Sequence, residues 1–294
     1  MPELPEVETI RQDLREKILG KKITRVLLTN KAIINVSPQK FKNSLQNQKI
    51  VEVERIGKLL MFVLANQEYL LVHLKMTGQL VWIKSLPNPP FSKGRETIAG
   101  GHPEPSVEQL PNKFTRITLE FNNGGKLFFN DIRRFGYMRL ENKIELAKIK
   151  AKFGPEPLTK EFTFAYLKKV LSNKNKPIKV ALMDQDKIAG IGNIYASEIC
   201  FEAKILPNRK ASSLKGAELK ALHLACNKVI KIAIKNRGTT FSDYVDTAGR
   251  GGYNISFLNV YDREGKNCKV CQKTKIVKIV QGGRGSFYCP KCQK

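Results

Sequence analysis

The sequence predicts an α+β protein of more than one domain, with a β-rich first half, a helical segment after it and a small cysteine-bearing module at the end. Two observations lead to this fold class: the periodicity of the apolar residues changes midway, and four of the six cysteines cluster after residue 267. A chain of 294 residues is also longer than a typical single domain. The hydrophobic content of 41% excludes global disorder, and no run approaches the ~18 uncharged apolar residues of a membrane-spanning helix.

The first half combines one amphipathic helix with short β-like runs. Val7, Ile10, Leu14 and Ile18 are spaced by three or four residues and predict a helix over residues 5–18. A second helix is predicted at 38–45. The predicted strands cover residues 23–28, 50–56, 59–64, 69–74, 79–83, 116–121, 126–129 and 137–140. Residues 85–112 hold six prolines and three glycines, which predicts a long surface loop.

The second half has helical periodicity up to about residue 236. Helices are predicted at 161–172, 178–185, 193–203 and 213–236. Residues 237–267 are rich in glycine and predict a mobile loop, and two short strands are predicted at 274–280 and 285–288. We expect three domains, covering residues 1–150, 151–250 and 251–294.

The charge of the chain is strongly positive and concentrated near its end. There are 52 Lys+Arg against 26 Asp+Glu, a formal net charge of +26. Residues 204–294 hold 19 basic and 5 acidic residues, a net charge of +14. A segment with so few acidic residues would repel itself without an anionic partner. The charge therefore indicates a polyanionic partner, of which nucleic acid is the commonest and an acidic membrane surface is the alternative.

The four clustered cysteines have the spacing of a zinc site. Cys268 and Cys271 form one Cys-x2-Cys pair, and Cys289 and Cys292 form a second after 17 intervening residues. Each pair can give two thiolates to one ion, which predicts a single structural Zn²⁺ in a ribbon of two strands. Two disulfides are the alternative, and they require an oxidising compartment. Glu3, Glu6 and Glu8 stand where a secretory signal would be basic, so we expect a cytoplasmic protein.

Arg284 lies in the glycine-rich turn between the two predicted ribbon strands, within the sequence QGGRGS. Glycines on both sides allow a close backbone approach, and a guanidinium there can bind a phosphate or a base edge. The alternative is an ordinary exposed arginine on a flexible tip.

The amino terminus, MPELPEVET, contains a candidate nucleophile. Removal of the initiator Met before the small residue Pro2 would expose a secondary amine, which titrates near pH ~8 and can attack an aldehyde carbon. Glu3 beside it could transfer protons. The alternative is that both residues only open a helix, where a carboxylate favours the positive dipole end.

These features together resemble the bacterial formamidopyrimidine-DNA glycosylases along nearly the whole chain. The resemblance includes the amino terminus, the four-cysteine ribbon and six further stretches, which are GKLL (57–60), HLKMTG (73–78), DIRRFG (131–136), LMD (182–184), GIGNIYASE (190–198) and RGSFYC (284–289). It implies a β-sandwich with a flanking helix, a helix–two-turns–helix domain and the zinc ribbon. It also implies excision of oxidised purines from duplex DNA and β,δ-elimination at the abasic site. Damaged double-stranded DNA would be the partner of a monomer, with no membrane and no small-molecule cofactor.

The resemblance also assigns roles to particular residues. Pro2 would attack C1′ of the damaged nucleotide, Glu3 would transfer protons, and Lys58 would act in elimination and contact phosphate. Arg284 would contact phosphate at the ribbon tip and assist the second elimination. The remaining residues would contact DNA: Met76, Arg133 and Phe135 would fill the space that the extruded base leaves, and Lys174, Lys179 and Asn193 would bind the backbone. From the residues themselves, core packing is the alternative for Met76 and Phe135, a surface ion pair for Arg133 and a solvated side chain for Lys58.

The sequence departs from the family pattern at two places. The usual Pro before the Arg-Arg-Phe run is Ile132, and the family's Lys-His-x-His stretch appears as Lys113-Phe114-Thr115-Arg116. We therefore do not carry the DNA contact of that first His over to Phe114. Residues 238–253 correspond to the loop that closes over the flipped base. The rival functions are an endonuclease VIII-like glycosylase for oxidised pyrimidines, which Leu4 disfavours, and a non-catalytic zinc-ribbon DNA-binding protein.

Overall fold

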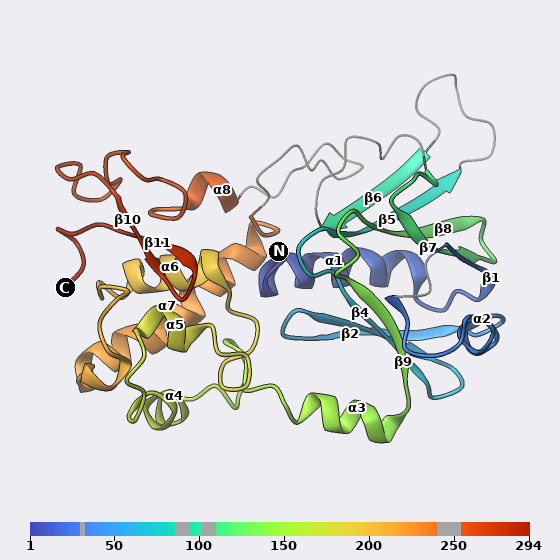
Figure 1. Ribbon diagram of the computed structural model, residues 1–294, viewed down its shortest axis with the longest axis horizontal. Coiled ribbons are helices and arrows are strands. Elements are labelled where there is room, and N and C mark those ends of the chain that lie inside the picture. The colour runs from blue at the N-terminus through green and yellow to red at the C-terminus, as the bar shows by residue number, and fades with distance from the viewer. Residues whose placement is uncertain (30–32, 86–94, 102–109, 240–253) are drawn as a thin grey trace. The chain divides into compact units, whose positions relative to one another are not determined.

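The computed structural model describes residues 1–29, 33–85, 95–101, 110–239 and 254–294 (Figure 1). The chain forms two compact units. The first comprises Met1–Ala151 and Arg237–Tyr253, and the second comprises Lys152–Asn236 and Asn254–Lys294. The division into three domains remains a prediction.

The first unit contains two antiparallel sheets that share one core. The five-stranded sheet has the order β1-β7-β8-β5-β6, and the four-stranded sheet has the order β2-β3-β4-β9 (Figure 1). The strands of the first sheet are β1 (Ile23–Leu28), β5 (Gly78–Ser85), β6 (Arg95–Gly101), β7 (Thr115–Phe121) and β8 (Gly125–Asp131). Those of the second are β2 (Ile50–Ile56), β3 (Leu59–Leu64), β4 (Tyr69–His73) and β9 (Tyr137–Glu141). Buried side chains of both sheets, such as Phe129 and Phe62, pack in the same cluster, which makes the pair a β-sandwich.

Helix α1 (Leu4–Ile18) covers one side of this sandwich. It buries Val7, Ile10, Leu14 and Ile18 in the shared core, as the apolar spacing predicts. The helix contacts β2 and β6, which are edge strands of the two sheets. Covering exposed strand edges protects them from pairing with another chain. The amino terminus therefore leads directly into a helix that is packed on the core of the unit.

Two secondary-structure predictions for the first unit were wrong. Residues 85–112 are not one continuous loop, because β6 pairs antiparallel with β5. The loop was predicted because the segment is rich in proline. Thr97 and Ile98 are nevertheless β-branched residues, which favour a strand. Helix α3 (Lys143–Lys150) was missed because its apolar stripe is incomplete: Ile144 is 68% exposed, and Leu146 is its buried apolar residue. The predicted helix at 38–45 is confirmed as α2 (Pro38–Leu45).

The second unit is mostly helical and ends in the ribbon. Its elements are α4 (Phe164–Leu171), α5 (Ile178–Leu182), α6 (Asn193–Glu202), α7 (Gly216–Lys235), α8 (Asn254–Phe257), β10 (Val277–Gln281) and β11 (Arg284–Tyr288). The four long helical predictions are confirmed with shorter bounds. For example, the Thr163 hydroxyl accepts from the Tyr166 N–H at 3.0 Å, so α4 begins later than predicted. None of the helices in the described ranges has the length and apolar content needed to cross a membrane.

The ribbon shares a core with helix α6. Phe201 of α6 packs with Phe287 of β11, with Ile276 and with two of the clustered cysteines. The buried carboxylate of Glu198 accepts from the N–H groups of Val260 and Tyr261 at 2.9 and 2.8 Å. Burial raises the pKa of Glu198, and these backbone donors counteract part of that rise. The segment that leads into the ribbon is thus fixed to α6.

Candidate active site and nucleic-acid interface

The amino terminus is partly buried at the start of α1. Glu3 is 3% exposed, and its backbone N–H donates to Oε2 of Glu6 at 2.8 Å. Burial lowers the pKa of the Met1 α-amino group, and Lys58 acts in the same direction while Glu3 and Glu6 oppose it. An amine with a lowered pKa is more often neutral, and hence nucleophilic, at neutral pH. The structure therefore brings three predicted site residues, Pro2, Glu3 and Lys58, to one end of α1.

Glu6 also holds the segment that follows α7. Its Oε1 accepts from the Thr239 N–H at 2.6 Å. Gly238 has φ +81°, and a Cβ built there would lie 2.7 Å from Glu6 Oε1, so only glycine fits. Arg237 donates to both carboxylate oxygens of Asp13 at 2.8 and 2.7 Å. The loop predicted to close over the base continues into residues 240–253, which lie outside the described residues. The sequence alone indicated no role for Glu6 at this site.

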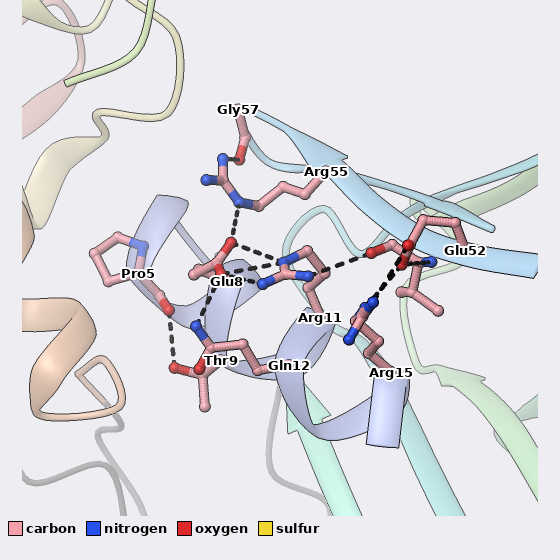
Figure 2. Close-up of polar contacts among 10 residues, drawn as sticks. Pro5, Glu8, Thr9, Arg11, Gln12, Arg15, Glu52, Arg55 and Gly57 are labelled. Carbon is pink, nitrogen blue, oxygen red and sulfur yellow. Dashed lines mark hydrogen bonds and ion pairs between the residues drawn. The ribbon is translucent and has the colours of Figure 1, made fainter. Parts of the chain in front are cut away.

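Lys58 lies in a tight turn between β2 and β3. Its side chain is buried, at 7% exposure, so the alternative of a solvated lysine is wrong. Gly57 before it has φ +55°, which the turn requires. Figure 2 shows how this turn is tied to α1: Arg55 donates to the Gly57 carbonyl at 3.2 Å and to Glu8 at 2.9 Å. Glu8 also receives the Arg11 guanidinium (Figure 2).

Glu8 remains ionised between its two arginine partners. Burial acts to raise the pKa of Glu8, but the hydrogen bonds from Arg11 and Arg55 outweigh it and leave the pKa below its ordinary value. The ion pair between Arg55 and Glu8 is largely shielded, with both side chains 13% exposed. The Lys58 turn is therefore held by a charged contact that persists at neutral pH.

The three residues predicted to fill the space of an extruded base are at the surface. Met76 is 45% exposed and Phe135 is 53% exposed, so core packing is not their role. The Arg133 guanidinium lies 4.6 Å from the centre of the Phe135 ring. The Arg133 N–H donates to the hydroxyl of Thr77, the residue after Met76, at 3.1 Å. The two turns that carry these side chains are thus joined.

His73, next to these turns, is held in its neutral form. Burial lowers the pKa of His73 to about 3, and the nearby charges of Lys75 and Lys58 act in the same direction. Its Nδ1 accepts from the Lys75 N–H at 3.0 Å, which requires that nitrogen to be unprotonated. His73 therefore supplies no positive charge near neutral pH.

Asn193 and Lys179 form a polar cluster with the start of strand β11. Lys179 is 0% exposed, and its ammonium donates to Asn193 Oδ1, the Gly285 carbonyl and the Ser286 hydroxyl at 2.6, 2.7 and 2.8 Å. The Lys179 ammonium is therefore engaged within the protein, and its predicted contact with the DNA backbone stays a prediction. It orients the Asn193 amide with its oxygen inward.

Arg284 and Lys174 are less buried. Arg284 directly follows Gly282 and Gly283, which have φ +53° and +71°, as a two-residue hairpin turn with both central residues left-handed requires. Its Nη1 lies 3.6 Å from Sδ of Met183. The Lys174 ammonium lies 3.9 Å from the Asp184 carboxylate, with its side chain 28% exposed.

The four clustered cysteines form a site for one structural zinc ion. Their sulfur atoms lie within 4.8 Å of one another. Sγ of Cys268 and Cys292 are 3.9 Å apart, and those of Cys271 and Cys289 are 3.8 Å apart. Tetrahedral zinc with Zn–S bonds of about 2.3 Å requires sulfur atoms about 3.8 Å apart. A disulfide requires about 2.05 Å, so the disulfide alternative is wrong.

This combination of fold and side chains defines a strongly basic protein that joins a β-sandwich, a helical unit and a four-cysteine zinc ribbon. Three family profiles match the chain: the formamidopyrimidine-DNA glycosylase N-terminal domain over residues 1–138, the H2TH domain of the same proteins over 153–245, and the zinc finger found in FPG and IleRS over 265–294. The chain belongs to the formamidopyrimidine-DNA glycosylase family.

Named relatives and solved structures agree with this assignment. The formamidopyrimidine-DNA glycosylase of Pelotomaculum thermopropionicum is 41% identical over 297 residues, covering 100% of this chain and 99% of the relative. That of Listeria monocytogenes is 39% identical over 298 residues, covering 100% of both chains. A complex of the Lactococcus lactis Fpg with DNA containing an abasic site has a TM-score of 0.85 at 30% identity and covers 99% of each chain. A second, with Fapy-dG DNA, has a TM-score of 0.84 at 30% identity and covers 99% of this chain and all of the other.

Proposed function

We propose that this protein is a base-excision repair enzyme that removes oxidised purines, including 8-oxoguanine and formamidopyrimidines, from duplex DNA and then cleaves the strand at the abasic site. Its full-length relatives carry the name of this glycosylase. The observation that carries the proposal is the amino terminus, where the buried side chains of Glu3 and Lys58 lie close to the end of the chain that holds Pro2.

Pro2 is the proposed nucleophile. After removal of Met1, its secondary amine attacks C1′ of the damaged nucleotide, the N-glycosidic bond breaks, and the base leaves with the bonding electrons and gains a proton. Glu3 exchanges protons with the opening sugar ring. The resulting iminium accepts electrons as the C2′ proton is removed and the 3′ C–O bond breaks, and the 5′ C–O bond breaks in the second elimination. Lys58, whose turn is held by Arg55, assists these proton transfers and binds phosphate.

Met76, Arg133 and Phe135 are the proposed substitutes for the extruded base. Removing a base from the stack costs a few kcal/mol in lost stacking and pairing. An exposed thioether and an exposed aromatic ring can recover apolar contact there, and a guanidinium can bind the orphaned base. The exposure of all three side chains supports this role, because surface apolar groups of this size gain from such contacts.

Backbone contacts are assigned to Asn193, Arg284 and Lys174. With its oxygen bound to Lys179, the Asn193 amide presents its nitrogen as the donor. For Lys179 we propose that it holds the Asn193 side chain in position for the DNA backbone and does not contact phosphate itself. We further propose that the enzyme acts as a monomer on nucleoid DNA in the cytoplasm, with zinc as its structural ion and no small-molecule cofactor.

The substitution Glu3→Gln tests this function. It removes a proton donor and acceptor while changing little contact area, so base release should be abolished while binding of lesion-containing duplex remains within about threefold. Single-turnover excision and equilibrium binding measure the two effects. An equal loss of binding and turnover would mean that Glu3 is structural.

A further inference from the structure

The three side chains proposed to replace the extruded base come from two turns. Residues 74–78 join β4 to β5, and residues 132–136 join β8 to β9. Each turn contains a non-glycine residue in the left-handed region, Lys75 with φ +51° and Arg134 with φ +59°. This conformation is unfavourable for a residue with a side chain, and it persists where the surrounding structure holds it. Both turns therefore depend on contacts that restrain their backbone.

One buried carboxylate, that of Asp131, binds both turns. Asp131 is the last residue of β8 and pairs with Gly78, the first residue of β5, so it lies where both turns meet the sheet. It is 0% exposed. Its Oδ1 accepts from the Thr77 hydroxyl and from the Arg133 N–H at 3.2 Å, and its Oδ2 accepts from the Gly136 N–H at 2.7 Å. Donors from the two turns thus converge on a single side chain.

The groups around this carboxylate are closely packed. The Thr77 hydroxyl donates to Asp131 and accepts from the Arg133 N–H at 3.1 Å, so it links the two turns directly. A Cβ at Gly136 would lie 3.1 Å from Asp131 Oδ2 and 2.8 Å from Cζ of Phe129. A side chain at position 136 would therefore push the turn away from the carboxylate.

The arrangement requires a side chain with two acceptor oxygens. A carboxylate accepts at both oxygens, whereas an asparagine amide accepts at its oxygen and donates from its nitrogen. In either orientation of an amide at position 131, the nitrogen would face the N–H of Gly136 or that of Arg133. The turn 132–136 would then lose one of its two bonds to this side chain, and a buried donor would be left without an acceptor.

We propose that Asp131 is a positioning residue that holds the two turns in one fixed arrangement, so that their three exposed side chains enter the base stack together. The inference rests on the proposed function of these side chains. Met76 and Phe135 are about half exposed, at 45% and 53%, so their placement depends mainly on the backbone of the turns. A wedge that is already in place loses less conformational freedom when it enters the DNA.

The substitution Asp131→Asn tests this role on two duplexes. In the first duplex 8-oxoguanine is paired with cytosine. In the second it lies opposite an abasic-site analogue, where extrusion costs less and leaves no orphaned base. On the paired lesion, a misplaced wedge should make single-turnover excision roughly 10- to 100-fold slower than wild type. On the second duplex the rate should stay within about threefold of wild type, because the wedge has less to replace.

Two further sets of variants provide the controls. Glu120→Gln makes the same change from acid to amide on β7 of the same sheet, where Glu120 pairs with the surface residue Lys126, and it should leave both rates unchanged. Thermal melting establishes that each variant is folded. If Asp131→Asn does not fold, Thr77→Val replaces it, because valine removes the hydroxyl that links the turns. Thr77→Ser keeps that hydroxyl and should restore the wild-type rate.

The dependence on the duplex separates positioning from a general loss of structure. Wild-type excision of the paired lesion by Asp131→Asn, or equal slowing on both duplexes, would overturn the positioning role and leave the proposed function intact. The same two results for Thr77→Val would have the same meaning. Borohydride trapping on duplex with a preformed abasic site tests the chemistry of Pro2 separately. A wild-type protein that neither traps nor excises would overturn the proposed function and this inference with it.

Discussion

Replacing Lys179 by methionine should destabilise the second unit, because the Lys179 ammonium joins α5, the start of α6 and strand β11. Methionine keeps most of the side-chain length and removes the three donors. Loss of the ammonium leaves the Gly285 carbonyl and the fully buried Ser286 hydroxyl without this partner. Asn193 is half-buried and can turn towards water. Two acceptors thus bear most of the cost.

The magnitude follows from these two acceptors. A buried polar group left without its partner costs about 1–3 kcal/mol. Removal of an ammonium from the interior offsets part of that sum, so we expect a net loss of about 3 kcal/mol. Because the unfolding entropy is about 2.1 cal/mol/K per residue, 1 kcal/mol lowers Tm by about 4 °C in a unit of 126 residues, and Tm should fall by about 12 °C. Lys174→Met is the control, since its ammonium is 3.9 Å from Asp184 and partly exposed, a contact worth less than about 1 kcal/mol.

DNA binding separates the two possible roles of Lys179. If its ammonium only positions Asn193, Lys179→Met should weaken binding to abasic-site duplex without changing the slope of log affinity against log salt. A direct phosphate contact would make that slope shallower by about one unit. Titrations at several salt concentrations measure the slope, and thermal melting measures stability. An unchanged Tm, or a slope reduced by one, would refute the positioning role.

Three further predictions concern the ribbon, its tip and the segment after α7. The four-thiolate site predicts one zinc per chain by metal analysis, and chelation should unfold the ribbon and weaken DNA binding; an active zinc-free preparation would contradict this. Arg284→Ala should make the slope of log affinity against log salt shallower by about one unit. It should leave the preference for lesion DNA unchanged, because a phosphate contact does not read bases. An unchanged slope would show that Arg284 does not contact phosphate. Gly238→Ala should lower Tm and slow excision, because the position has φ +81° and faces Glu6. The backbone strain alone costs about 1–2 kcal/mol. A wild-type Tm and excision rate would show that the segment tolerates a side chain.

Much of the fold could be predicted because its apolar spacing is regular. The stripe Val7, Ile10, Leu14 and Ile18 predicted α1 correctly, and the paired Cys-x2-Cys spacing predicted the zinc site. Helix α3 could not be found in this way, since Ile144 faces solvent. Strand β6 was hidden by the prolines around it.

The candidate site could be predicted only in part. Motifs located Pro2, Glu3 and Lys58, but they gave no information about burial. A lysine can contact phosphate at the surface or bind polar groups in the interior, and its residue type does not distinguish these roles. The structure shows that Lys179 is buried and bound to Asn193. The buried Asp131 carboxylate accepts from the Thr77 hydroxyl and from the backbone N–H groups of Arg133 and Gly136, and the residue types alone do not predict these contacts.

Borohydride trapping shows whether the amine of Pro2 forms a covalent intermediate with damaged DNA. The protein is incubated with duplex that contains 8-oxoguanine in the presence of borohydride, and the adduct is digested and sequenced by mass spectrometry. We expect a protein–DNA adduct in which the peptide starts at residue 2, without Met1, and carries the reduced sugar on its terminal nitrogen. An adduct on a lysine, or fully active protein that retains Met1, would contradict it.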